Sequence, residues 1–297
     1  MKDAPSRFWH SGEEALQRRV DSHAHLAKLA PRILRPFMPE QHRTFFAQLP
    51  FIVLGTVDED GRPWATLRAG TPGFVHTPDD RRIHIASPVE AGDPARFDAD
   101  APVGLLGIEP HTRRRNRANG FVESADADGF EIAVVQSFGN CPKYITRREA
   151  RFVESAAGET ETFTGLDAQA VETVSRADTF FVASHVHGED GRAQVDVSHR
   201  GGPPGFVRRN GDTLVVPDYV GNQFFNTLGN FAMNPVAGLT FVDFEHGDLL
   251  QLTGTIELNF DAPSDLPGAL RAWHFTPTHG VRRRGALALR WLDVVNP

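Results

Sequence analysis

Amide and hydroxyl side chains are concentrated in residues 217–234, which read PDYVGNQFFNTLGNFAMN. Five amide side chains lie between Asn222 and Asn234, more than the capping of one helix needs. The pattern predicts a strand that ends near residue 217 and a helix that runs to Asn234. A helix amino terminus presents free N–H groups and the positive end of its dipole, which together bind phosphate. The stretch is therefore predicted to hold an anionic ligand, and the alternative is a capped turn that only joins strand to helix.

The strand that precedes this stretch adds a second set of polar side chains. Alternation places Asp196 and Ser198 on one face, and His199, Arg200 and two glycines follow. A guanidinium group beside a hydroxyl is well suited to an anion, because charge-assisted hydrogen bonds are the strong ones.

An arginine-rich segment, HTRRRNRANG at residues 111–120, is a third candidate. Strand alternation sends Arg113, Arg115 and Arg117 to one face and the two residues between them to the other. That face can meet an anion, or the segment is an edge strand whose charges discourage aggregation. A nucleic-acid surface is not expected, because the formal net charge is −7 and no aromatic residues are interleaved.

The segment FGNCPKY at residues 138–144 gathers Asn140, Lys143 and Tyr144. Lys143 places a positive charge where it can tune a bound cofactor, and the alternative is a Gly-Asn turn followed by an extended segment. Cys141 is the only cysteine, which excludes an intrachain disulfide and fits a cytoplasmic protein. We interpret it as a small buried hydrophobe, since no resolving thiol exists.

An internal repeat organises the strands that position these groups. Residues 51–75 and 180–207 share an apolar run, an acidic turn ending in Gly-Arg, an alternating run and the closure GxPGFV. Each copy continues into a short strand, a polar stretch and a Pro-Val-x-Gly-Leu-like strand. Two β units of roughly 100 residues each in tandem agree with the length of the chain.

The predicted fold is mainly β with flanking helices (α+β), with two barrel-like β units in tandem. The predicted parts are a helical N-terminal arm over 1–50, with helices at 14–34 and 39–48, a first β unit over 51–145, a linker with a helix over 146–178, a second β unit over 179–262, and a C-terminal extension over 263–297 with a closing strand at 286–294. No apolar run reaches the length of a membrane span and no secretory signal is visible, so membrane association is not expected.

The order of these motifs resembles the split-barrel flavoproteins related to pyridoxamine 5′-phosphate oxidase. The motifs SHRGG at 198–202, PDYVGN at 217–222, NTLGN at 226–230 and QSFGNCPKYI at 136–145 are similar, more specifically, to the two-barrel FMN-binding branch. The resemblance covers nearly the whole chain. It implies that the two units are a first split barrel over 51–145 and a second split barrel over 179–262, tandem split β-barrels that pack as an intrachain pseudo-dimer. It implies one FMN that lies across the interface of the paired barrels, with its phosphate on the second barrel.

By position, the resemblance places phosphate and ribityl contacts on the second unit and a flavin contact at Gln251. Those oxidases carry basic residues in the polar turn, where this chain has Asn226 and Thr227. The groups left to neutralise the phosphate are therefore Arg200, helix and amide donors, or arginines of the first unit. The predicted cofactor-binding residues are Asp196, Ser198, His199, Arg200, Tyr219, Asn222, Gln223, Phe225, Asn226, Thr227, Leu228, Asn230, Gln251, Arg113, Arg115, Arg117, Asn140, Lys143 and Tyr144.

The first unit is not expected to hold a second copy of the site. Its corresponding turn carries Glu90, Asp93, Asp98 and Asp100, and four carboxylates would repel a phosphate. One site per chain is therefore predicted, with the first unit as the far wall of the pocket.

His185, His187 and His199 are weighed as metal ligands and set aside, because no carboxylate completes a recognisable spacing. Haem-handling split barrels exist, so a haem protein with His199 at the site is the alternative cofactor prediction.

The sequence contains none of the familiar catalytic or nucleotide-binding motifs, and no catalytic acid or base is predicted. We predict an FMN-dependent oxidoreductase that takes a small-molecule substrate or NAD(P)H, with a separate reductase and a homodimer as further options. The alternative from another class is a flavin-binding relay or sensor module without turnover of its own.

Overall fold

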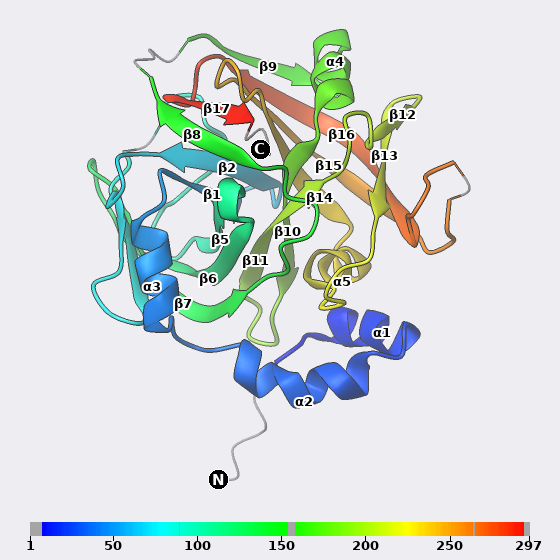
Figure 1. Cartoon of the computed structure of the whole chain (residues 1–297), viewed down its shortest axis with the longest axis horizontal. Helices are drawn as coiled ribbons and strands as arrows, with labels where there is room; N and C mark the ends of the chain where they lie inside the picture. The colour runs from blue at the N-terminus through cyan, green and yellow to red at the C-terminus, as the bar shows by residue number, and fades with distance from the viewer. Residues whose placement is uncertain (1–7, 89, 154–157, 264, 294–297) are drawn as a thin grey trace.

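The computed structural model describes residues 8–88, 90–153, 158–263 and 265–293. Residues at the two ends of the chain and at 154–157 therefore fall outside the described part, and with them the outer ends of the predicted arm and closing strand and part of the predicted linker. The described residues form two large antiparallel sheets, a small two-stranded sheet and flanking helices (Figure 1). The predicted mainly β split-barrel fold is confirmed.

The first sheet has the strand order β2-β1-β5-β6-β7-β4-β3. Its strands are β1 (Phe51–Val57), β2 (Pro63–Ala69), β3 (Val75–His76), β4 (Arg82–Ile85), β5 (Pro102–Glu109), β6 (Arg114–Ala125) and β7 (Phe130–Gly139). A short 3-10 helix, η1 (Pro110–Thr112), separates β5 from β6.

The second sheet repeats this order as β11-β10-β14-β15-β16-β13-β12, with β9 added beside β16. Its strands are β9 (Thr160–Thr164), β10 (Thr179–His187), β11 (Ala193–Gly201), β12 (Arg208–Asn210), β13 (Thr213–Asp218), β14 (Val236–Val242), β15 (Leu249–Asn259) and β16 (Arg271–Arg283). The long hairpins even share a bulge, after Asn119 in the first sheet and after Thr253 in the second. The sequence repeat is therefore a repeat of topology and register.

The barrels meet through close backbone contacts at two corresponding glycines. A Cβ atom on Gly104 of β5 would lie 2.8 Å from the carbonyl oxygen of Val195 on β11. A Cβ atom on Gly238 of β14 would lie 2.3 Å from the carbonyl oxygen of Pro63 at β2. Any side chain at either position would push the two barrels apart.

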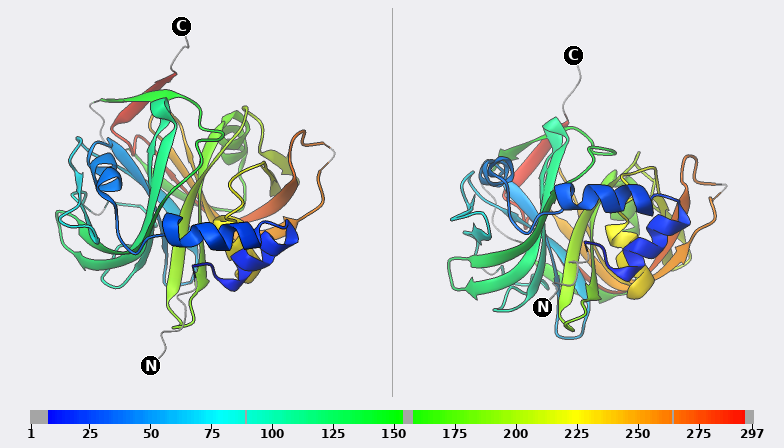
Figure 2. Two further views of the ribbon diagram at one scale, coloured as in Figure 1. Left: turned by 60° about the horizontal axis from the view of Figure 1, so that its bottom comes forward. Right: turned by 90° about the horizontal axis from the view of Figure 1, so that it is seen from below.

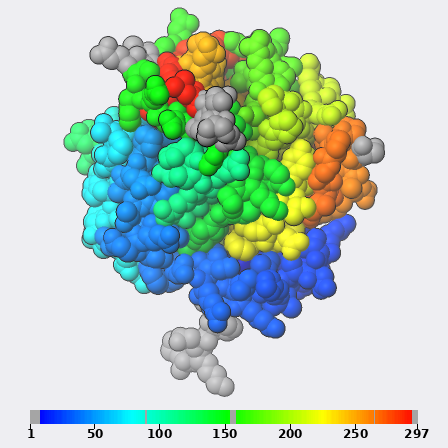
Figure 3. All heavy atoms as spheres, in the orientation of Figure 1, coloured from blue at the N-terminus to red at the C-terminus, as the bar shows by residue number. Residues whose placement is uncertain are grey.

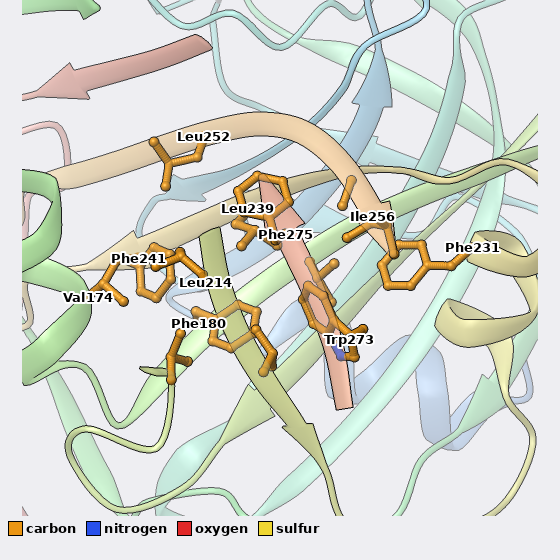
Figure 4. Close-up of a cluster of buried hydrophobic side chains, with 14 of the residues drawn as sticks. Val174, Phe180, Leu214, Phe231, Leu239, Phe241, Leu252, Ile256, Trp273 and Phe275 are labelled. Carbon is orange, nitrogen blue, oxygen red and sulfur yellow. The ribbon is translucent and has the colours of Figure 1, made fainter. Parts of the chain in front are cut away.

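The central strands are buried on both faces, which explains why their sequences do not alternate. In β1, Ile52 points into the core of the first barrel, whereas Val53 belongs to a third cluster that also contains Phe181 of β10. The core of the second barrel is aromatic, and Phe180, Phe241 and Trp273 pack together within it (Figure 4).

Three helices form the N-terminal arm: α1 (Ser11–Arg19), α2 (His23–Ile33) and α3 (Glu40–Ala47). The predicted single helix over 14–34 is wrong, because the chain turns between α1 and α2 at Asp21, whose φ is 56°. Figure 2 shows the dark blue α1 against the yellow α5 (Asn226–Met233), with α2 beside α1, and Figure 3 shows the blue arm along that edge of the surface. At this crossing a Cβ on Gly12 would lie 2.3 Å from the carbonyl oxygen of Gly229.

The linker and the C-terminal part are more ordered than predicted. Besides α4 (Ala168–Arg176), the linker contains β9 and β8 (Arg148–Phe152), and β8 pairs with β17 (Leu289–Asp293). The predicted end of the second barrel at residue 262 is too early, because β16 pairs with both β15 and β13 inside the second sheet.

Candidate functional site

A pocket lies between the two barrels, and its lining includes residues of β6 in the first sheet and of β11 and the start of α5 in the second unit. It draws residues from both units, as a site shared between paired barrels requires. The structure brings together most of the predicted set: Arg115, Arg117, Asn140, Lys143, Tyr144, Ser198, His199, Arg200, Tyr219, Asn222, Gln223, Phe225, Asn226, Thr227 and Leu228.

Four predicted residues lie elsewhere. Arg113 is exposed and left-handed, with φ of 57°, because η1 ends there and β6 begins one residue later. Asp196 and Asn230 line a neighbouring pocket on the other side of Arg117. Gln251 is fully buried on the first unit's side of the interface, where its amide donates to the Ala65 carbonyl oxygen at 3.0 Å.

Positive charge is concentrated on the floor and wall of the pocket. Burial, and then the charges of Arg117 and Arg200, lower the pKa of Arg115 to about 9. Burial also lowers the pKa of Arg117 and of Arg200, opposed by Asp196 and Asp218 respectively. The Nε atoms of Arg117 and Arg200 are buried without a hydrogen-bond acceptor among the described residues. An anion in the pocket would favour the charged form of all three guanidinium groups and so offset the cost of burying them.

The charges do not balance within the protein. Four guanidinium groups line the pocket, those of Arg115, Arg117, Arg200 and Arg271, whereas two carboxylates neutralise them: Asp196 lies 3.3 Å from Arg117 and Asp218 lies 3.2 Å from Arg271. A phosphate monoester carries about −1.5 to −2 charges near neutral pH. The guanidinium groups therefore carry a surplus of two positive charges, and the exposed Lys143 at the mouth adds a third, so the pocket can accept one phosphate group.

Hydroxyl groups meet next to these arginines. Ser198 Oγ lies 2.8 Å from Thr227 Oγ1, and Arg117 Nη2 donates a hydrogen bond to the same Ser198 oxygen. The helix α5 begins at this point, and no side chain caps its amino terminus. The free N–H groups of its first turn thus face the same space as the hydroxyls and guanidinium groups.

The backbone around the pocket is strained at three non-glycine residues. Tyr144, Gln223 and Phe225 adopt left-handed conformations, with φ of 65°, 59° and 63°. Such residues cost free energy and persist where the surrounding structure fixes them, often at ligand sites. The turn before α5 is therefore shaped for more than joining a strand to a helix.

The mouth of the pocket is aromatic and partly exposed. The rings of Tyr144 and Tyr219, the only two tyrosines of the chain, lie 5.2 Å apart, and Tyr144 donates to the Val220 carbonyl oxygen at 3.1 Å. Lys143 is exposed beside them. A ligand with an anionic group and a planar ring would thus meet guanidinium groups inside and aromatic surface at the rim.

A network of buried polar groups lies behind Arg117. Asp196 accepts from Asn119 at 2.7 Å and from Asn230 at 3.2 Å, and Asn230 contacts His10 at 2.9 Å. Glu13 of α1 accepts a hydrogen bond of 2.5 Å from Asn226. Burial, followed by the charge of Asp196, raises the pKa of Glu13 to about 8, so this carboxyl is mainly protonated near neutral pH.

The histidines do not assemble a metal centre. His199 is buried, its Nδ1 lies 3.4 Å from Arg115 Nη1, and burial together with nearby arginines lowers its pKa well below the usual value. His185 contacts Asn234 at 2.9 Å and stacks edgewise on His187. Among the residues that the structure describes, no group of three or more His, Cys, Asp or Glu side chains is arranged to hold a metal ion.

Several site residues were missed by the sequence analysis. Arg271, at the start of β16, was assigned to a loop-rich extension, and Asp218 was treated only as part of the turn. His10 and Glu13 contact α5 from more than 200 positions away in the sequence, and no local pattern signals that contact. The available signal was His10 followed by Glu13, which form a capping box at the start of α1.

Comparison with known proteins identifies part of the chain. Residues 38–162 match the family model described as pyridoxamine 5′-phosphate oxidase. This stretch spans the first sheet and less than half of the chain. No curated protein gives a significant match.

Several solved structures are similar to part of the chain. HupZ of Group A Streptococcus is 15% identical, with 38% of this chain and 90% of that chain covered and a TM-score of 0.29. A Clostridium acetobutylicum protein of the pyridoxinephosphate oxidase family, related to general stress protein 26, is 18% identical over 42% of this chain and 92% of its own, with a TM-score of 0.27. HutZ of Vibrio cholerae, described as a heme storage protein, is 9% identical over 40% and 95%, with a TM-score of 0.27.

Residues 38–162, which include the first sheet, are therefore similar to the pyridoxamine 5′-phosphate oxidase family. The second unit repeats the strand order of the first, so the described residues form a tandem of two split barrels. None of the helices that the structure describes combines the length and apolar character needed to cross a bilayer.

Proposed function

We propose that the chain binds one FMN in the pocket between its barrels and acts as a flavin-dependent oxidoreductase of the two-barrel, FMN-binding kind. The observation that carries the proposal is the surplus of buried positive charge at Arg115, Arg117 and Arg200, next to the uncapped start of α5. These groups fit a phosphate monoester, and the match of residues 38–162 supports a flavin as the rest of the ligand.

In this proposal each part of the pocket has a defined task. Arg117, Arg200 and the Ser198–Thr227 pair hold the phosphate, and the amide side chains of the turn bind the ribityl hydroxyls. Tyr144 and Tyr219 cover one side of the ligand and exclude water from it. When bound, the flavin supplies the electron chemistry, while the protein supplies binding, orientation and local charge.

A haem in the same pocket is less well supported. His199 is the one histidine that lines the pocket, and it lies among three guanidinium groups with Arg115 Nη1 at 3.4 Å from its Nδ1. The named heme storage protein HutZ is similar to this chain only at 9% identity. The charge and the hydrogen-bond donors of the pocket favour a phosphorylated ligand.

The proposal is tested by spectra and by titration. We expect the purified protein to be yellow or to take up FMN at one per chain, and to bind riboflavin at least about tenfold more weakly, because riboflavin lacks the phosphate. A Soret band, or equal affinity for FMN and riboflavin, would overturn the assignment. Enzyme and relay module are separated by anaerobic NADH or NADPH: bleaching of the bound flavin indicates turnover, and bleaching only by dithionite or an added reductase indicates a relay.

A further inference from the structure

Strand pairing relates each residue of one sheet to a residue of the other. Leu54 of β1 and Val182 of β10 occupy equivalent positions, because Leu54 pairs with Leu105 of β5 and Val182 pairs with Leu239 of β14. On the other side, Leu54 pairs with Thr66 of β2 and Val182 pairs with Ser198 of β11. Thr66 therefore corresponds to Ser198. Two residues further along the same strands, Arg68 corresponds to Arg200.

The facing barrel completes the correspondence. Gly104 of β5 and Gly238 of β14 are equivalent, so Leu106 and Thr240, each two residues later on the same strand, are equivalent too. Leu106 pairs with Arg117 of β6, and Thr240 pairs with Gln251 of β15. Gln251 is thus the counterpart of Arg117. By the shared bulge, Arg283 is the counterpart of Asn140.

The four counterparts, Thr66 and Arg68 of the first sheet and Gln251 and Arg283 of the second, converge on one carboxylate, that of Asp93. Its Oδ2 accepts from Thr66 at 2.7 Å and from Arg68 at 2.5 Å, and it lies 3.2 Å from Arg283. Its Oδ1 accepts from Gln251 at 3.1 Å. The Asp93 side chain is 1% exposed, so this anion is enclosed completely.

The second unit has no carboxylate at this place. The stretch from Gly221 to Asn226 contains no acidic residue, and Thr227 makes the contact to Ser198 that Asp93 makes to Thr66, at 2.8 Å against 2.7 Å. The closed counterpart is also balanced in charge, since Asp93 and Glu90 face Arg68 and Arg283. One site is filled from within, and the other is open.

We propose that the first unit retains a latent oxyanion site in which the Asp93 carboxylate is the built-in occupant. Removal of that carboxylate leaves a pocket for a small external oxyanion, a carboxylate such as formate or inorganic phosphate, held by Thr66, Arg68 and Gln251. The placement of Asp93 also marks where the anionic oxygens of a ligand lie in the open site, beside Ser198, Arg200 and Arg117.

The test uses the full chain with Asp93→Ala, and Asp98→Ala, exposed in the same turn, as the matched control. Thermal unfolding is followed in formate, phosphate and chloride at equal ionic strength. We expect formate to raise the Tm of Asp93→Ala by about 2 to 4 °C more than chloride does, with no such difference in the control. A carboxylate-sized site gives this response to formate; a response to phosphate alone shows that the site takes tetrahedral oxyanions instead. No difference between the salts in folded Asp93→Ala refutes the proposal.

Binding stoichiometry separates this proposal from the proposed function. By equilibrium dialysis with formate and with inorganic phosphate, Asp93→Ala combined with Arg200→Ala should keep a site, for the anion that stabilises Asp93→Ala, that Arg200→Ala alone lacks. That result does not depend on whether the open site takes FMN. Binding of neither anion by the folded double variant contradicts the latent site and leaves the open site untouched.

A reciprocal variant guards against failure of Asp93→Ala to fold. Thr227→Asp places a carboxylate beside Ser198, as Asp93 lies beside Thr66. We expect it to fill the open site, to raise the Tm of the ligand-free protein and to weaken phosphate binding there by at least about tenfold. Unchanged phosphate binding in Thr227→Asp overturns the correspondence on which the proposal rests.

Discussion

Ser198 Oγ lies 2.8 Å from Thr227 Oγ1, so strand β11 and helix α5 meet where the arginines of both barrels converge. Arg200→Ala and Thr227→Ala should each weaken FMN binding, Arg200→Ala more strongly. Loss of a charge-assisted contact costs about 1.5 to 3 kcal/mol, or roughly ten-fold to over a hundred-fold in affinity. Fluorescence titration measures the change. Arg113→Ala is the matched control, because Arg113 is exposed outside the pocket, and equal losses in control and test variants would contradict the placement of the phosphate.

Asp196→Asn should strengthen the binding of an anion at the same site. Asp196 is the internal counter-ion of Arg117, and its neutralisation leaves that guanidinium group without a charge partner in the ligand-free protein. We expect the Tm of the ligand-free protein to fall and the affinity for inorganic phosphate to rise by about three- to ten-fold. Calorimetric titration measures the affinity, and weaker binding would show that Asp196 positions Arg117 rather than competing for it.

Glu13→Gln should change the pH dependence of stability. Glu13 has a pKa near 4.5 in the unfolded chain and about 8 in the folded protein, so the folded state binds more protons between these values. Stability therefore falls as pH rises from about 4.5 to 8, and Glu13→Gln should flatten that decline. Urea unfolding at pH 5, 6.5 and 8 measures it. Glu14→Gln, on the neighbouring residue, is the control, and an unchanged pH profile in Glu13→Gln would contradict a protonated Glu13.

Gly229→Ala should loosen the N-terminal arm. A Cβ on Gly229 would lie 2.8 Å from the Glu13 amide nitrogen, so α1 must move away from α5. Forced overpacking of this kind costs about 1 to 3 kcal/mol. Limited proteolysis should then cut the arm faster than in the wild type, whereas Ala232 →Gly, on the same helix, weakens α5 without a clash and serves as the comparison. Equal protection of the arm in Gly229→Ala and wild type would show that the crossing tolerates a methyl group.

The sequence repeat made the two tandem β units and the polar turn predictable, because the same succession of motifs occurs twice in the chain. The helix after Asn226 and the strand faces of Arg115 and Arg117 follow from local pattern alone, and all three are found in the structure. The strands β8 and β9 could not be predicted, since each is only five residues long and polar, β8 being mostly charged, and their partners lie more than 100 residues away.

Gln251 shows why one site residue was misplaced. In paired barrels each pocket takes its turn from one barrel and a facing strand from the other. Because Gln251 lies on the facing strand of the second barrel, it serves the pocket of the first unit and contacts Asp93 there. The residue at the same strand position for the open pocket is Arg117. The four acids of the first unit were expected to repel a phosphate; instead Asp93 and Glu90 are paired with arginines, and Asp93 fills the space.

The pairing of β8 with β17 has a consequence for folding during synthesis on the ribosome. Domains generally fold as they emerge, amino-terminal first. The strand β8 leaves the ribosome long before β17, and β9 leaves it before its partner β16. The backbone hydrogen-bonding groups of both linker strands therefore stay unpaired while the second barrel is still being translated. The first barrel can fold early, but the linker strands pair only when β16 and β17, the last strands that the structure describes, have been synthesised.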